Sequence, residues 1–306
     1  MNVVAANHSS YPRSMPRSSE SPVIAAAVAE QIGAGMDLIT DGQVTWADPV
    51  SHVMQSSAGV RLGQTRRFFD SSVEYREPVI TGTLRRGRST LAQDCRTAAR
   101  AGGKPVKAVL TGPYTLTRLS LVEPGAYPSY RELARDVSLI LADEVRDLAA
   151  AGAAVIQLDE PAICEHPEDI RLLRQLFEPI YDARGGAMIA VATYFFDGDS
   201  LYAPLNSIPA DIVAVDLPSS GRLAETIAAT GASKILALGV VDGRNPQLED
   251  PNTIARRLVH LLHRYTLETI YLQPSCGLVQ LSAEQARAKL RLVAAIRTAF
   301  LEMSPT

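Results

Sequence analysis

Six side chains that can do chemistry share one kind of position, because each stands at or just beyond the end of a short apolar run. They are Asp41, Asp159, Asp216, Asp242, Arg244 and Cys276. Carboxylates gathered at the mouth of an apolar fold lose solvation energy, so they are expected to meet a cation, an amine or a metal. The residue types therefore predict a small-ligand site that is rich in carboxylates and also holds one thiol and one guanidinium.

Several of these side chains also have a plainer interpretation. Asp41 and Asp242 come directly before glycine and could simply form turns. Asp159 differs, because Glu160 follows it at a predicted strand end and a proline then stops the strand. Successive side chains on a strand point to opposite faces, so we expect either Asp159 or Glu160 to face the interior. His8 follows the first run and could be a ligand, a general base or a loop residue.

The elements that must position these residues recur in a regular order. Apolar runs lie at residues 3–6, 37–40, 106–110, 154–158, 188–192, 211–215, 234–238 and 269–272. Continuous runs of this kind are typical of strands that a parallel sheet buries on both faces. Helical patterns lie between several of them, at 22–34, 130–151, 251–265 and 283–301. This alternation predicts an α/β fold, a (β/α)8 TIM barrel over residues 1–306 with its site at the carboxyl ends of the strands.

One stretch, residues 61–90, departs from this order. Its alternating pattern around residues 72–76 predicts a hairpin-like insertion between the second and third strands. Such an excursion forms a lid, an interface or a plain surface loop. No Gly-x-Gly-x-x-Gly follows the first run, so a dinucleotide site is not indicated.

Composition excludes several classes of protein. The chain is 46% hydrophobic and 21% charged, with a formal net charge of −3, so disorder is excluded and no drive toward nucleic acid or a membrane surface is expected. No basic, then apolar, leader opens the sequence, which predicts a cytoplasmic protein. Cys95, Cys164 and Cys276 are too few and too widely spaced for a disulfide framework or a Cys-x-x-Cys metal site.

Four segments carry a resemblance to a known family. Leu-Thr-Gly-Pro-Tyr-Thr at 110–115, Ile-Gln-Leu-Asp-Glu-Pro-Ala at 156–162, Gly-Val-Val-Asp-Gly-Arg-Asn at 239–245 and Pro-Ser-Cys-Gly-Leu at 274–278 resemble cobalamin-independent methionine synthase. Those enzymes look like two related barrels in tandem, and the C-terminal one carries zinc. The resemblance implies transfer of a methyl group to homocysteine or a similar thiol, with a folate or corrinoid donor. This chain has the length of one barrel.

The resemblance also bears on zinc. The family's zinc-bearing half supplies a His-x-Cys pair, a Glu and a Cys. Tyr194, Phe196 and Asp216 fall at the first three of these positions, and only Cys276 keeps its identity. One thiol and one carboxylate do not make a tight zinc site unless other ligands enter. We therefore expect a single-barrel homologue closest to the zinc-less N-terminal half, with a degenerate metal site at Cys276.

Roles for individual residues follow from the same resemblance. Asp159 matches a carboxylate that is associated with the ammonium group of homocysteine, and Gln43 stands where the family has Glu. Trp46 could stack on a planar ligand or anchor a helix. We expect the substrate to be bound by Asp41, Gln43, Trp46, Asp159, Glu160, Tyr194 and Arg244. The expected catalytic group is His8 as a base, with Cys276 and Asp216 near the reacting atoms.

Two alternatives stay open. The chain could be a catalytically inactive, zinc-less barrel that acts as the partner subunit of a separate zinc-bearing barrel, or it could form a homo-oligomer. It could also perform different chemistry on the same scaffold, since related barrels include decarboxylases of porphyrinogens and a fold does not fix a function.

Overall fold

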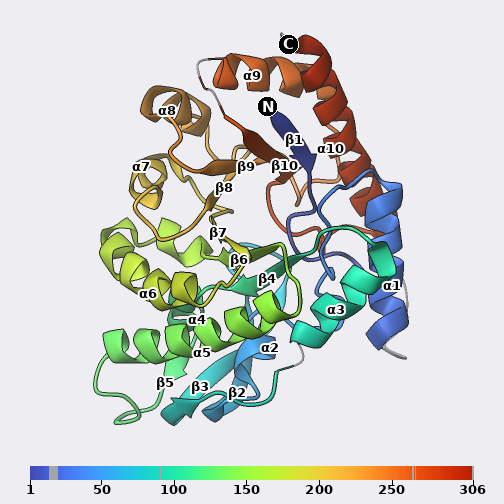
Figure 1. Ribbon diagram of the computed structural model, residues 1–306. Helices are drawn as coiled ribbons and strands as arrows, with labels where there is room; N and C mark the ends of the chain where they lie inside the picture. The colour runs from blue at the N-terminus through green and yellow to red at the C-terminus, as the bar shows by residue number, and fades with distance from the viewer. Residues whose placement is uncertain (14–19, 90, 264, 266, 305–306) are drawn as a thin grey trace.

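A curled parallel sheet forms the centre of the computed structural model, which describes residues 1–13, 20–89, 91–263, 265 and 267–304. Its seven strands lie in the order β1-β10-β9-β8-β7-β6-β4 (Figure 1). Their bounds are β1 Asn2–Ala5, β4 Lys107–Thr111, β6 Val155–Asp159, β7 Met188–Ala192, β8 Ile212–Asp216, β9 Ile235–Val241 and β10 Thr269–Pro274. Each corresponds to a predicted apolar run; β7 coincides with its run, and the other strands differ from theirs by at most three residues at either end.

The eighth predicted run, residues 37–40, joins the two edges of this sheet. It forms two isolated parallel bridges, Ala6 with Leu38 beside β1 and Ile39 with Val106 beside β4. A longer ladder is not formed, because the Ala5 amide donates to the Asp37 side chain (3.0 Å) and the neighbouring Pro105 has no N–H to donate. The expected strand is thus reduced to a short closing segment, and the fold is TIM-barrel-like.

Helices surround the sheet on its outer side (Figure 1). The longer ones are α1 Glu20–Gly33, α3 Leu91–Gly102, α5 Tyr130–Ala150, α6 Ile170–Asp182, α8 Leu223–Thr230, α9 Pro251–Leu262 and α10 Ala283–Met303. The shorter ones are α2 Ser51–Met54, α4 Pro113–Arg118, α7 Tyr202–Leu205 and three 3-10 turns at Pro161–Cys164, Pro167–Asp169 and Asp199–Leu201. Helix α9 ends before the predicted limit of 265, and residue 264 lies outside the described residues.

The helix starts have clear local causes. A capping box at Ser282 and Gln285 opens α10, and the side chains of Ser129 and Asp250 accept backbone amides at the starts of α5 and α9. No helix in the described part of the chain is long and apolar enough to cross a membrane.

A second sheet occupies the stretch that breaks the βα order. Strands β2 (Ala58–Arg67) and β3 (Glu74–Arg85) pair antiparallel, and β5 (Leu121–Val122) pairs parallel with β3. Residue 90, at the end of the predicted excursion, lies outside the described residues. The turn at 68–73 carries Phe68, whose ring lies 6.2 Å from that of Phe195 beyond β7. The second sheet therefore reaches the carboxyl-terminal side of the first one.

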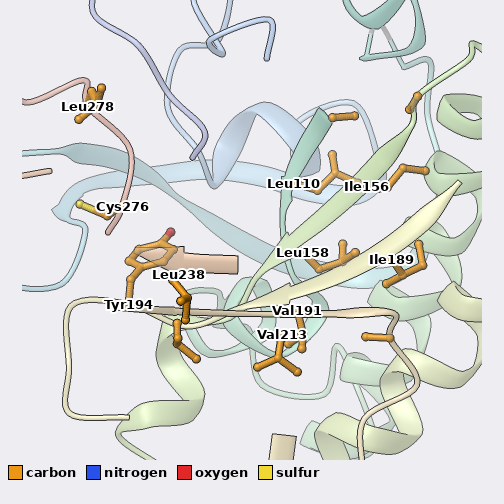
Figure 2. Packing of buried hydrophobic residues seen from close by; sticks show 14 of the residues in the cluster. Leu110, Ile156, Leu158, Ile189, Val191, Tyr194, Val213, Leu238, Cys276 and Leu278 are labelled. Carbon is orange, nitrogen blue, oxygen red and sulfur yellow. The ribbon is translucent and has the colours of Figure 1, made fainter. Parts of the chain in front are cut away.

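The two faces of the central sheet differ in composition. Ile156 and Leu158 of β6 belong to the large core between sheet and helices, which also contains Val191 and Val213 (Figure 2). The alternate residues face the barrel interior, where small side chains such as Ala190, pairing across the strands with Gln157, predominate. The outer face thus supplies most of the apolar packing, and the inner face leaves room for polar groups.

Candidate functional site

A cavity of about 350 Å³ opens at the carboxyl ends of the strands. It is lined by residues 9–13, 43, 44 and 46–49, by Phe68, Val73 and Glu74 of the second sheet, and by Asp159, Tyr194, Phe195, Gly277, Val279 and Gln280. Segments that follow β1, β6, β7 and β10 thus meet the hairpin turn in one hollow. This is the place where a barrel of this type is expected to hold its site.

Asp159 is a buried carboxylate in the wall of this cavity. It is 5% exposed and accepts a hydrogen bond at each oxygen, from Gln157 Nε2 (2.7 Å) and from the Tyr194 hydroxyl (3.1 Å). Burial raises the pKa of Asp159 to about 7, against the opposing effects of these two hydrogen bonds and of the Lys107 charge. The predicted inward orientation is therefore that of Asp159, and this group could bind a ligand cation.

Glu160 points the other way, as strand alternation requires. Its carboxylate accepts from the backbone amides of Tyr114 (2.9 Å) and Thr115 (2.7 Å) and from the Thr115 hydroxyl (2.7 Å). Burial raises its pKa to about 7, against these three hydrogen bonds. Glu160 thus holds the start of α4 and is not among the residues that line the cavity.

Tyr194 donates to Asp159, and His8 contacts Tyr194 but is not among the residues that line the cavity. The two rings meet edge to face with centroids 5.3 Å apart, and His8 Nδ1 lies 2.9 Å from the Ser9 hydroxyl. Burial, helped by the nearby Lys107 charge, lowers the pKa of His8 well below its ordinary value. His8 is therefore held neutral, the form in which an imidazole can accept a proton.

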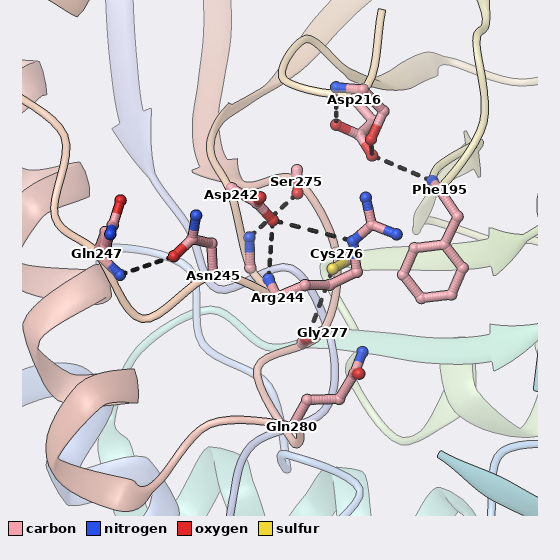
Figure 3. Close-up of polar contacts among 12 residues, drawn as sticks. Phe195, Asp216, Asp242, Arg244, Asn245, Gln247, Ser275, Cys276, Gly277 and Gln280 are labelled. Carbon is pink, nitrogen blue, oxygen red and sulfur yellow. Dashed lines mark hydrogen bonds and ion pairs between the residues drawn. The ribbon is translucent and has the colours of Figure 1, made fainter. Parts of the chain in front are cut away.

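Cys276, Asp216 and Arg244 do not line this cavity; Asp216 and Arg244 contact Phe195, which does line it, and Cys276 lies close to Arg244 (Figure 3). Asp216 accepts from the Ser219 hydroxyl (2.7 Å) and amide (3.1 Å) and from the Phe195 amide (3.1 Å). The Arg244 guanidinium lies 5.1 Å from the Phe195 ring centroid, with its Nε 3.9 Å from Asp242 Oδ1. Burial first, and then the Asp216 charge, raise the pKa of the Cys276 thiol, so Cys276 is a protonated thiol in this environment.

Arg244 and Asp242 also line a second, more open hollow of about 560 Å³. The other residues around it are Arg67, Asp70, Ser71, Ser72, Asn245, Pro246 and Gln280. Gln280 lines both hollows, so they adjoin one another.

The segment beyond the closing run contributes Gln43 and Trp46 to the cavity, but not Asp41. Gln43 adopts a left-handed backbone (φ 52°) after Gly42, and its side chain donates to the Val109 carbonyl (3.2 Å). Trp46 stacks on His52, with ring centroids 4.7 Å apart and planes 10° from parallel. Burial, and then the Asp94 charge, raise the pKa of Asp41 to about 7.

A family model described as "Cobalamin-independent synthase, Catalytic domain" matches residues 9–298 of this chain. The chain belongs to the cobalamin-independent methionine synthase family. The matched description is that of the catalytic domain, and the expected likeness to the zinc-less N-terminal half stays a prediction.

Individual proteins agree with this assignment. The methionine synthase of Saccharolobus solfataricus is 29% identical over 280 residues, which cover 87% of this chain and 80% of that protein. The 5-methyltetrahydropteroyltriglutamate–homocysteine methyltransferase of Streptomyces avermitilis is 29% identical over 292 residues, or 90% of this chain and 37% of that protein. A B12-independent methionine synthase from Shewanella, solved with selenomethionine, has a TM-score of 0.84 at 20% identity and covers 99% of this chain and 100% of its own. At that identity the last comparison shows the fold.

The four side chains that the sequence resemblance assigns to the zinc position, Tyr194, Phe196, Asp216 and Cys276, are a poor donor set for zinc. Phe196 has no donor atom, and the Tyr194 hydroxyl already donates to Asp159. Asp216 already accepts three hydrogen bonds from protein groups. Cys276 is the one N or S donor among the four. Within the described ranges, no group of three or more His, Cys, Asp or Glu side chains could hold a metal ion.

Sequence reasoning missed several polar groups at the site, among them Asp48 and Gln280 in the cavity wall and Lys107 behind it. Lys107 lies within the third apolar run, and its ammonium group contacts Gln157 and Gln273 inside the barrel. The only signal was a lysine in an otherwise apolar strand, at a position that alternation places on the inner face.

Proposed function

We propose that this chain transfers a methyl group to the sulfur of homocysteine or of a similar thiol-bearing amino acid. The observation that carries the proposal is the buried Asp159 carboxylate in the cavity wall, hydrogen-bonded at both oxygens in a member of this family. An ammonium group is the natural partner for such a carboxylate, because an unpaired buried charge is costly. Asp159 would thus orient the amino-acid end of the acceptor.

The donor that we propose is a methylated reduced folate, in agreement with the names of the curated relatives. Trp46 and Gln43 also line the cavity and would contact its planar ring. Arg244, between Asp242 and Phe195, would meet a carboxylate of either substrate. Asp41 and Glu160 would then act from behind the cavity wall, on the segments that carry Gln43 and α4.

The acceptor thiol must lose its proton as the methyl group arrives. His8 is neutral and its ring lies against Tyr194, so we propose it as the group that accepts this proton. As the sulfur–methyl bond forms, the nitrogen–methyl bond of the folate breaks, and the proton taken from the thiol would be returned to that folate nitrogen. Cys276 and Asp216 would border the reacting sulfur. The turn at 68–73 would cover the donor, since Phe68 and Val73 line the cavity.

A direct assay tests this function. The purified chain is incubated with homocysteine and a methylated folate, and methionine is measured by mass spectrometry. We expect Asp159→Asn to lower kcat/KM by about 10- to 100-fold, the value of one hydrogen-bonded charge. The matched control is Asp182→Asn, which changes an exposed acid at the end of α6. Absence of methionine from the wild-type chain, or equal rates for both variants, would refute the proposal.

The replaced zinc-ligand positions favour a second candidate, a partner subunit for a separate zinc-bearing barrel. This function predicts methionine formation only when the two proteins are mixed, and co-elution of the pair in size-exclusion chromatography. Metal analysis separates the candidates further. About one zinc ion per chain that disappears in Cys276→Ala would indicate a remodelled metal site in this chain instead.

A further inference from the structure

Lys107 places an ammonium group inside the barrel. Its side chain is 2% exposed, and Nζ donates to Gln157 Oε1 (2.9 Å) on β6 and to Gln273 Oε1 (2.7 Å) on β10. Both partners are neutral amides. A buried cation normally requires a carboxylate nearby, and neutral amides alone do not balance its charge.

The carboxylate that balances the Lys107 charge is that of Asp159, and the Gln157 side-chain amide lies between the two groups. Gln157 accepts from Lys107 at Oε1 and donates through Nε2 to Asp159 Oδ1 (2.7 Å). The amide dipole thus has its oxygen toward the cation and its N–H toward the anion. This is the orientation that stabilises the charged forms of both groups.

Two further contacts agree with a charged pair. Gln273 gives its oxygen to Lys107, while its own Nε2 finds no partner in the part of the chain that the structure describes. Asp159 accepts at both oxygens, from Gln157 and from Tyr194, as a carboxylate does. The two hydrogen bonds that connect the groups therefore run in one direction, from the Lys107 ammonium through the Gln157 amide to the Asp159 carboxylate.

We propose that Lys107 is a positioning residue that acts through the Gln157 amide to hold Asp159 as the carboxylate that binds the ammonium group of the substrate. The binding of the substrate ammonium by Asp159 rests on the proposed function. The relay itself, from Lys107 through the Gln157 amide to Asp159, does not. Lys107 does not line the cavity, so it affects the ligand only through Asp159.

The electrostatics of the surroundings give the direction of the effect. Burial raises the pKa of Asp159 and lowers that of Lys107, in each case to about 7, and the opposite charge of the partner offsets part of each shift. The other titratable groups near the pair are His8 beyond β1, Tyr194 beyond β7 and Cys276 beyond β10, together with Glu160, whose carboxylate points the other way, to the start of α4. Of these, the neutral His8, Tyr194 and Cys276 add no charge and Glu160 opposes ionisation of Asp159, so removal of Lys107 should raise the pKa of Asp159 further.

A titration of the ligand-free protein tests the relay without any need for catalysis. The carboxyl carbon signal of Asp159 is followed by NMR against pH and is assigned by its loss in Asp159→Asn. In Lys107→Met we expect the midpoint to rise by about 1 pH unit or more. The control is Lys234→Met, which removes a partly buried lysine near the start of β9 and should leave the midpoint unchanged. An unchanged midpoint in Lys107→Met would overturn the proposal.

A second variant covers the case in which Lys107→Met does not fold. Gln157→Leu keeps both charges and removes the amide between them, so the Asp159 midpoint should also rise; a midpoint equal to that of the wild type would overturn the relay. In kinetic assays, Lys107→Met should raise KM for homocysteine about 10-fold. With a thiol acceptor that has the homocysteine skeleton but lacks the amino group, KM should be unchanged. Equal changes for both acceptors would indicate a merely structural role, and failure of all variants and the wild type to form methionine would affect only the proposed function.

Discussion

Asp41 should destabilise the folded protein at neutral and alkaline pH, and Asp41→Asn should remove that effect. The side chain is buried at the edge of a small internal hollow and accepts one hydrogen bond, from the Gln43 amide (3.1 Å). Burial and the Asp94 charge raise its pKa from 3.8 to about 7. In the unfolded chain the carboxyl loses its proton near its ordinary pKa, so the folded state binds more protons between these two values.

The magnitude follows from this difference. The contribution of Asp41 to the free energy of unfolding should fall as pH rises from about 4 to about 7 and stay level above that, because ionising a buried carboxyl in the folded state costs free energy. Three pH units correspond to about 4 kcal/mol, so Asp41→Asn should be more stable than the wild type by up to about 4 kcal/mol at pH 8 and about equal to it at pH 4. The buried acids Asp159 and Glu160 are present in both proteins, and their contributions cancel in the difference.

Urea unfolding followed by circular dichroism at about pH 4, 6 and 8 measures this difference. The matched control is Asp70→Asn, which changes an exposed aspartate in the hairpin turn and should alter stability by no more than about 0.5 kcal/mol. An offset between Asp41→Asn and wild type that stays constant across the three pH values would refute the reasoning. So would a variant that loses stability as pH rises.

Two other predictions rest on close packing. A Cβ at Gly112 would collide with the Glu160 carboxylate that holds α4, so Gly112→Ala should lose about 1 to 3 kcal/mol of stability in a thermal melt. Gly186→Ala, in open space, should melt like the wild type. The Cys276 thiol is fully buried and its pKa is raised, and that of Cys164 is raised to about 12, mainly by burial. Thiol titration at pH 8 should therefore be slow in the native protein and complete only in denaturant, and rapid native labelling of Cys276 would contradict the environment described.

The strands could be predicted because burial on both faces leaves continuous apolar runs. The closing segment at 37–40 shows the limit of that reasoning. Its residues read as a full strand, yet Pro105 beside it lacks a donor and the Asp37 side chain takes the Ala5 amide. These effects depend on a neighbour that is distant in sequence, so a local pattern does not reveal them.

The candidate site was predictable to the level of strand ends. Alternation required Asp159 and Glu160 to face opposite ways, but which of them faces inward depends on a register that can slip by one residue in a sequence-based assignment. Lys107 could not have been linked to Asp159, because its contacts bring together residues 50 and 166 positions apart. Sequence spacing carries no information about such a pairing across a barrel.

The inner face of the sheet explains why this polar relay can exist. Barrel interiors are usually filled by bulky branched side chains, whereas the inner positions of β7, β8 and β9 here include Ala190, Ala192, Ala214 and Ala237. Small residues on these strands leave space for the long side chain of Lys107 to reach both β6 and β10. The outer face, packed with leucine, isoleucine and valine against the helices, supplies the apolar burial that the inner face lacks. Stability and the charge of the site thus come from opposite faces of the same strands. A substitution of Ala by Leu on the inner face should therefore change the pKa of Asp159 more than it changes the free energy of unfolding.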